Sequence, residues 1–303
     1  MIADRPLLGI LLMLGFCVLA PMGDALAKVL GETVPLVQLI LVRFGVQAVI
    51  LVPLVLLTGR RFVMSRRVFG LTILRTVLHI VGIGAMFAAL RFLPLADAVA
   101  IAFVMPFIML LLGRYVLNEV VGYRRLAACA IGFVGTLLVV QPSFAEVGSP
   151  ALLPLLVAVV FALFMLVTRQ VAKDVDPISM QAVSGVFAVL GLGLIALVFG
   201  QPGSDLGWVR PDGREMWLLA AIGIIGTVAH LLMTWSLRFA PSATLAPMQY
   251  LEIPVATLVG WLVFADLPNG LAAAGITITM AAGLYIVMRE RAMVRTPASV
   301  PKP

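Results

Sequence analysis

Four ionisable residues lie inside long apolar stretches of this sequence: Glu252, His79, His230 and Arg43. Titratable and charged groups are costly among apolar residues, so each one is a candidate for function. The glutamate could exchange a proton or pair with a cationic group of a ligand, and the histidines could exchange protons near neutral pH. The arginine needs an acidic partner, backbone carbonyls or an anionic ligand group. The alternative for each is a structural role with hydrogen bonds across helices.

Three further residues could form walls of a binding site. Tyr250 and Gln249 adjoin Glu252, and Trp235 stands in the same apolar stretch as His230. Aromatic rings stack on planar ligands, although helical cores contain such residues without any ligand. The predicted substrate-binding set therefore consists of these three residues and the four ionisable ones.

Asp24 and Lys28 are one helical turn apart within the first apolar stretch. This spacing allows a local ion pair, so we predict a pair at a helix end, with a pore entrance as the alternative. Pro106, Pro247 and Pro254 interrupt two later stretches, where they are predicted to act as gating bends or simply as interruptions.

No cofactor or metal site is predicted. Two histidines and one glutamate could hold a metal ion, but they come from three separate stretches without local ligand spacing. Cys17 and Cys129 both lie in apolar runs, which favours neither a disulfide framework nor a thiolate site. The net charge of +7 is scattered over short connections, so no nucleic-acid partner is predicted either.

The composition indicates an all-α integral membrane protein. The chain has 303 residues, of which 62% are hydrophobic and 12% charged, and its mean hydropathy is +1.15. About 20 apolar residues are needed to cross the bilayer as a helix, and ten stretches come close to this length. The first imitates a cleavable signal peptide, but we interpret it as a span. The predicted spans are 7–27, 36–57, 69–90, 95–117, 126–141, 151–171, 179–199, 216–237, 242–264 and 271–288.

The basic residues predict the orientation of these spans. Most Lys and Arg residues fall in alternate connections and near both chain ends, whereas the other side holds only Lys28, Arg91, Arg210 and Arg214. Positively charged connections stay in the cytoplasm. We therefore predict a multi-pass protein of the inner membrane with both termini cytoplasmic.

An internal repeat divides the chain. Residues 90–119 and 237–266 begin LRFLPLADA and LRFAPSATLAP, and they share further glycine, proline and acidic positions. Five helices in each half make the second half enter the membrane from the opposite face, so the halves are predicted to be inverted. His79 and His230 then fall on matched faces of equivalent helices, and Arg75 shares the face of His79.

These segments, together with Pro35-Leu36 leading to Arg43, resemble the drug/metabolite transporter superfamily, specifically proteins with two tandem EamA domains. The resemblance implies EamA repeats at residues 8–141 and 151–288, followed by a polar cytoplasmic tail at 289–303. Members carry vitamins such as riboflavin, S-adenosylmethionine, amino acids, nucleosides or drugs. One departure is that the second half has small or apolar residues near Gly185 where the first half has Arg43.

We therefore predict a secondary transporter, not an enzyme, that moves a small polar organic metabolite by alternating access, with proton coupling as one option. Its cavity should be lined by the first to fourth and sixth to ninth spans, with the fifth and tenth peripheral or at a homodimer contact. The alternatives are a membrane-embedded enzyme acting on lipid-linked substrates and a channel or scramblase. An Asp-rich motif and a Gly-rich phosphate loop are both missing from the sequence.

Overall fold

A computed structural model describes residues 5–60, 62–118 and 122–295, and over these ranges the chain is helical without strands. The polar tail is predicted to begin at residue 289, but α12 continues to Arg295. The rest of the predicted tail, 296–303, lies outside the described residues. The helices are α1 (Pro6–Leu30), α2 (Leu36–Leu57), α3 (Arg66–Leu90), α4 (Leu95–Ala102), α5 (Met105–Val116), α6 (Tyr123–Val147), η1 (Ser149–Leu152), α7 (Leu153–Val171), α8 (Pro177–Phe199), α9 (Gly213–Phe239), α10 (Ser242–Leu245), η2 (Ala246–Leu251), α11 (Glu252–Phe264) and α12 (Gly270–Arg295).

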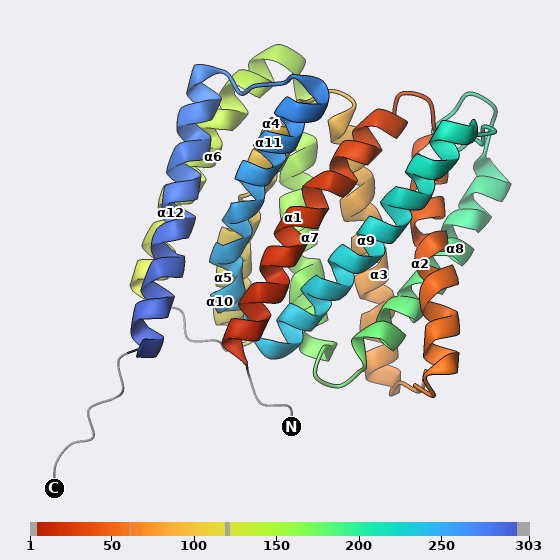
Figure 1. Ribbon diagram of the computed structural model, residues 1–303, viewed down its shortest axis with the longest axis horizontal. Coiled ribbons are helices and arrows are strands. Elements are labelled where there is room, and N and C mark those ends of the chain that lie inside the picture. The colour runs from red at the N-terminus through yellow and green to blue at the C-terminus, as the bar shows by residue number, and fades with distance from the viewer. Residues whose placement is uncertain (1–4, 61, 119–121, 296–303) are drawn as a thin grey trace, which may run out of the picture.

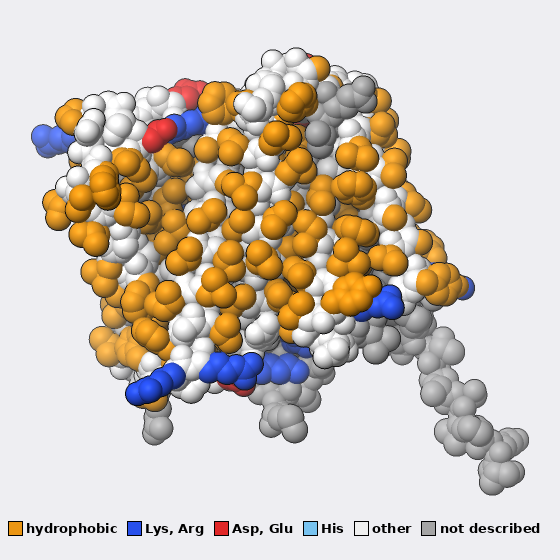
Figure 2. Space-filling view, turned by 180° about the vertical axis from the view of Figure 1, so that it is seen from behind, with side chains coloured by type: hydrophobic (Ala, Val, Ile, Leu, Met, Phe, Trp, Pro, Cys, Tyr) orange, Lys and Arg blue, Asp and Glu red, His pale blue; other side chains and the backbone are white. Residues whose placement is uncertain are grey.

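Apolar helices of membrane-crossing length make up most of the molecule. Within the described residues, eight segments are long and apolar enough to span a bilayer, and two shorter apolar helices, Met248–Phe264 and Gly270–Tyr285, occur where the ninth and tenth spans are predicted. Figure 2 shows hydrophobic side chains over the middle of the surface, with Lys and Arg side chains along its lower edge. The chain is therefore a multi-pass membrane protein.

Local sequence signals set the ends of several helices. Asp212 accepts a hydrogen bond from the Glu215 backbone N–H while Glu215 accepts one from the Asp212 backbone N–H, which is a capping box at the start of α9. Asp176 caps α8 by accepting hydrogen bonds from two backbone N–H groups, and Pro177 occupies the first helical position. These side chains fix where α8 and α9 begin.

The helices pack in pairs that combine the two parts of the chain. α1 packs on α9, α3 on α7, α2 on α8 and α6 on α12. The last pair lies at one end of the long axis in Figure 1, and α2 and α8 lie at the other. Glycines allow close approach: a Cβ on Gly275 would lie 2.3 Å from the carbonyl oxygen of Gly135, between α12 and α6.

Two of the predicted spans are interrupted near their middle. α4 and α5 are separated at Phe103 and Val104, and the ninth span consists of α10, η2 and α11. Pro106 and Pro254 lie in the first turns of α5 and α11. A backbone N–H in the first turn has no partner within the helix, so the missing N–H of proline costs little there. Pro247 lies in η2, and its side chain is outside the described part. Glu252 is the first residue of α11, directly after the interruption.

Candidate functional site

A cavity with a volume of about 90 Å³ lies between the two parts of the chain. Its lining comes from α1, α2, α3, α4, α5, α7, α9 and α11, with Phe103 at the break between α4 and α5. Among the described residues, α6, α8 and α12 contribute none of this lining. The lining residues that carry the argument below are Asp24, Arg43, His230 and Glu252, with Phe16, Phe87, Phe103 and Phe161.

Arg43 projects from α2 into this cavity. Its Nη2 donates to Nδ1 of His230 at 2.9 Å and to the carbonyl oxygen of Gly226 at 3.4 Å, while its Nη1 has no partner. A guanidinium can only donate, so the contact with Arg43 requires Nδ1 of His230 to accept. The same Nδ1 also lies 3.0 Å from the carbonyl oxygen of Gly226, a contact that requires Nδ1 to donate, so the tautomer of the ring decides which of the two is a hydrogen bond. One edge of the guanidinium thus stays available to another molecule.

Gly226 explains how a side chain as large as arginine fits here. A Cβ on Gly226 would lie 2.8 Å from Nε of Arg43, which is closer than real contacts allow. The glycine of α9 therefore makes room for the guanidinium of α2, which donates to the carbonyl oxygen of Gly226 and to Nδ1 of His230.

Two carboxylates face the same cavity, Glu252 from α11 and Asp24 from α1. Within the described part of the chain neither forms a hydrogen bond or an ion pair, although Asp24 lies close enough to Arg43 to attract it. The predicted pair of Asp24 with Lys28 is wrong. Lys28 instead reaches across to Asp266 at 3.1 Å and to the Leu93 carbonyl, so Asp24 remains a cavity residue that the sequence suggested only as an alternative.

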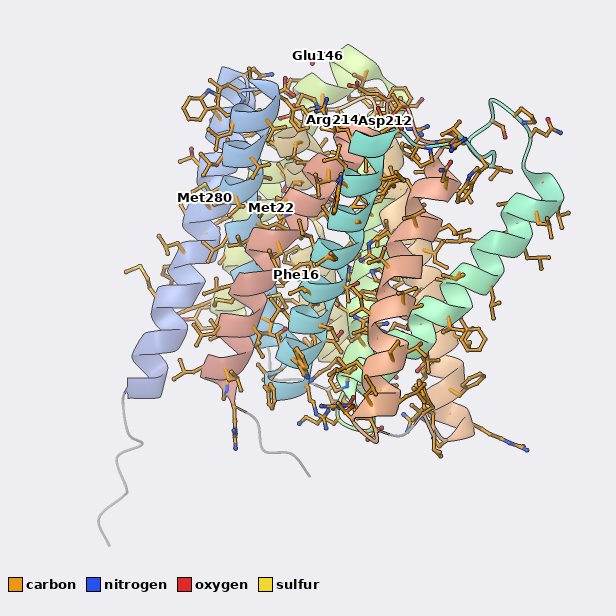
Figure 3. The ribbon with its side chains drawn as sticks, turned by 45° about the vertical axis from the view of Figure 1, so that its right-hand side comes forward. Phe16, Met22, Glu146, Asp212, Arg214 and Met280 are labelled. Carbon is orange, nitrogen blue, oxygen red and sulfur yellow. The ribbon has the colours of Figure 1, made fainter. Side chains whose placement is uncertain are left out.

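His79 contacts His230 but does not line the cavity. The ring centroids are 4.2 Å apart, and His79 also stacks on Phe164 at 4.5 Å and meets the edge of Phe44 at 5.1 Å. Figure 3 places Phe16, whose ring meets His230 edge-on, at mid-height of the bundle, whereas Asp212 and Arg214 lie at its upper end. The matched helical faces predicted for the two histidines thus meet directly.

The other three predicted site residues lie away from the cavity. Tyr250 is fully buried beside the glycines Gly132 of α6 and Gly283 of α12. The amide of Gln249 donates to Sδ of Met165 at 3.1 Å. Trp235 packs in an apolar cluster between α2, α8 and α9. Adjacency to Glu252 in sequence did not bring Tyr250 or Gln249 to the same surface, because η2 rotates them away from it.

A buried polar network surrounds Arg75 and joins the early parts of α3 and α8 to the late parts of α7 and α9. In Figure 1 these parts lie toward the end where α1 begins and α12 ends, here called the N/C end. The guanidinium of Arg75 donates to the hydroxyls of Thr168 at 2.8 Å, Ser184 at 3.0 Å and Thr234 at 3.5 Å. Gln181 joins the network through Thr234. Arg75 therefore links α3 to α7, α8 and α9, a connection that its helical face alone did not reveal.

With this geometry established, the relatives of the chain can be considered. The profile of the EamA-like transporter family matches residues 7–141 and again residues 148–289. The chain belongs to this family. Like other EamA proteins it is a transporter with a small-molecule substrate rather than an enzyme, and the resemblance found in the sequence is confirmed.

Curated relatives of this EamA protein carry specific names. It is 31% identical to a riboflavin transporter of Rhizobium johnstonii over 74% of this chain and 72% of the relative. It is 24% identical to an S-adenosylmethionine uptake transporter of Rickettsia felis over 88% of both chains. A crystal structure at 19% identity superposes with a TM-score of 0.68, covering 96% of this chain and 98% of the other, which supports the fold alone.

Proposed function

We propose that this protein is a secondary transporter that moves a small polar organic metabolite across the inner membrane by alternating access. The observation that carries the proposal is a mid-bundle cavity in which the charged groups of Arg43, Asp24 and Glu252 retain bonding capacity that the protein does not use. Buried polar groups are normally paired, so unused capacity in a cavity indicates a ligand. Riboflavin and S-adenosylmethionine, named for the relatives, are the first candidate solutes, with amino acids and nucleosides as further classes.

We further propose that the chain consists of two inverted five-helix repeats, residues 8–141 and 151–288, in ten spans. In this scheme α1 corresponds to α7, α3 to α9 and α5 to α11. The packing supports the scheme, because α1 packs on α9 as α7 packs on α3, and α1 packs on α11 as α7 packs on α5. The interruptions of the fourth and ninth spans also correspond. Two related halves could exchange conformations and expose one central site to either side in turn.

Equivalent hydrogen bonds at the two ends of the bundle support the same proposal. Arg91 donates to the carbonyl oxygen of Val34 at 3.5 Å, and its repeat counterpart Arg238 donates to that of Val175 at 3.3 Å. Both acceptors come shortly before the start of the second helix of a repeat. Because the repeats are inverted, these bonds lie at opposite ends and would close the cavity on opposite sides.

The proposed starting state is closed toward the N/C end. The network around Arg75 is fully buried there, while partly exposed ion pairs join connections at both ends: Arg60 with Asp176 at the N/C end, and Arg91 with Asp205 and Lys28 with Asp266 at the opposite end. The excess of Lys and Arg makes the N/C end cytoplasmic, with both termini on that side. A homodimer contact through α6 and α12 stays a prediction.

Glu252 is the residue on which proton coupling would depend. Its carboxylate lies in the cavity without a partner, so it can take a proton or a cationic group in one state and release it in the other. Arg43 would hold an anionic group, and His230, backed by His79, would position Arg43. Tyr250, Gln249 and Trp235 would support the helices that carry these residues.

The test is counterflow in proteoliposomes loaded with unlabelled riboflavin or S-adenosylmethionine, with labelled solute added outside at several pH values. Glu252→Gln should abolish exchange or remove its pH dependence, while the exposed control Glu146→Gln should behave as wild type. Equal folding of both variants is checked by gel filtration. Exchange by Glu252→Gln at the wild-type rate and with the wild-type pH dependence would refute the role of Glu252.

A further inference from the structure

We propose that the solute is a dipolar organic cation, with a planar ring, an anionic group that binds Arg43 and a positively charged group that binds between Asp24 and Glu252. This inference rests on the proposed transport function and narrows its solute class. It follows from the number, sign and bonding state of the groups in the cavity.

The anionic group is indicated by Arg43. Its side chain is only 2% exposed, yet Nη1 has no partner. The other end of the fork is anchored on His230 and Gly226, so the free edge is held in a fixed direction. A guanidinium with a preorganised free edge is suited to a carboxylate or phosphate, which can accept charge-assisted hydrogen bonds from it.

The positive group is indicated by the two carboxylates. Glu252 is 8% exposed and Asp24 is partly buried, and both face the cavity. Lys28, the nearest cation in the sequence to Asp24, is engaged by Asp266 instead. The protein therefore brings two carboxylates and one guanidinium to the cavity, while Lys28 is held outside it by Asp266.

The balance of charge selects the class of solute. Two carboxylates outnumber one guanidinium, and charges interact strongly where water and salt are excluded. A solute with one anionic and one cationic group pairs with Arg43 and one acid, leaving the other acid for a second positive group or a proton. With a neutral solute, Arg43 and Asp24 would have only their attraction for each other, and Glu252 would have no cation beside it.

The planar ring is indicated by the apolar walls. Phe16, Phe87, Phe103 and Phe161 line the same cavity as the charged residues. Aromatic side chains stack on flat rings and exclude water from the neighbouring ionic contacts. A flat heterocycle joined to a short dipolar chain matches this combination of surfaces.

The experiment measures direct binding of four probes to the purified full-length protein. S-adenosylmethionine carries a carboxylate, an amine and a sulfonium; S-adenosylhomocysteine lacks the sulfonium charge; 5′-methylthioadenosine lacks the dipolar chain; riboflavin is neutral. We expect S-adenosylmethionine to bind most tightly, and methylthioadenosine and riboflavin at least about tenfold more weakly, because each loses charge-assisted contacts.

Variants locate the contacts. Arg43→Gln should weaken S-adenosylmethionine at least about tenfold while leaving methylthioadenosine within about twofold. Asp24→Asn should weaken S-adenosylmethionine more than S-adenosylhomocysteine. The exposed residues Arg67 and Asp174 provide matched controls, as Arg67→Gln and Asp174→Asn. The wild-type probe series needs no variant, so a variant that fails to fold does not prevent the test.

The possible outcomes separate the two proposals. Riboflavin or methylthioadenosine binding as tightly as S-adenosylmethionine would overturn the dipolar-cation inference, and so would no binding of any probe. Charge-dependent binding without exchange across proteoliposomes would support the inference and count against the transport function. Exchange of riboflavin alone would leave transport standing and overturn the inference.

Discussion

Two buried arginines, Arg43 of α2 and Arg75 of α3, are held in different ways. Both lie over phenylalanine rings, with Cζ 4.8 Å from the Phe44 centroid in one case and 4.6 Å from the Phe164 centroid in the other. The hydroxyls around Arg75 engage every one of its nitrogens. Arg43 keeps Nη1 unpartnered at the edge of the cavity.

The difference shows how one residue type can serve two purposes in the same membrane. A guanidinium bonded to three other helices ties them together, which is the arrangement of Arg75. A guanidinium anchored at one edge and free at the other keeps donors for a ligand, which is the arrangement of Arg43 in the proposed site. Burial and helix position are alike in the two arginines, and only their partners distinguish them.

The largest expected effect is on the free energy of unfolding, when each arginine is changed to lysine in a separate variant. An ammonium cannot reach three hydroxyls on three helices, so Arg75→Lys should lower the free energy of unfolding by about 2 kcal/mol through lost charge-assisted hydrogen bonds. Arg43→Lys should lower it by half as much or less, and should mainly weaken solute binding. Unfolding in mixed micelles and probe binding measure the two quantities; equal stability losses would contradict the comparison.

A smaller effect is expected at the glycine that accommodates Arg43. In Gly226→Ala the new Cβ would displace the guanidinium, which can move because it ends a flexible side chain. We expect about tenfold weaker binding of a dipolar probe, or about 1.4 kcal/mol, with little loss of stability. Gly191→Ala is the matched control, since nothing lies within 4 Å of its position. Wild-type affinity in Gly226→Ala would show that the position of Arg43 does not matter for binding.

The smallest effect is expected at His79. Neither of its ring nitrogens has a partner, and its ring is packed among aromatic rings outside the cavity. His79→Phe should therefore change exchange rates less than about twofold, because it removes no hydrogen bond. His230→Phe, which removes the acceptor of Arg43, should reduce them more. A large loss of pH-dependent exchange in His79→Phe would instead assign His79 a proton-transfer role.

Much of the site was predictable because polar residues are rare inside apolar spans. Glu252, Arg43 and His230 were identified in this way, and all three line the cavity. Tyr250 was included by adjacency to Glu252, yet it packs against α6 and α12. Adjacent residues on a helix point in different directions, so a neighbour in sequence is a poor guide to the same cavity.

The sequence by itself determined that the chain lies in lipid, where its apolar helices occur and which family it resembles, because hydropathy and helix length follow from composition along the chain. Only the tertiary structure decided that Lys28 pairs with Asp266, that Asp24 joins Glu252 and Arg43 in one cavity, and that His79 meets His230. Periodicity defines faces relative to each helix axis. The rotation and depth of one helix against another depend on packing, and these decide which polar groups meet.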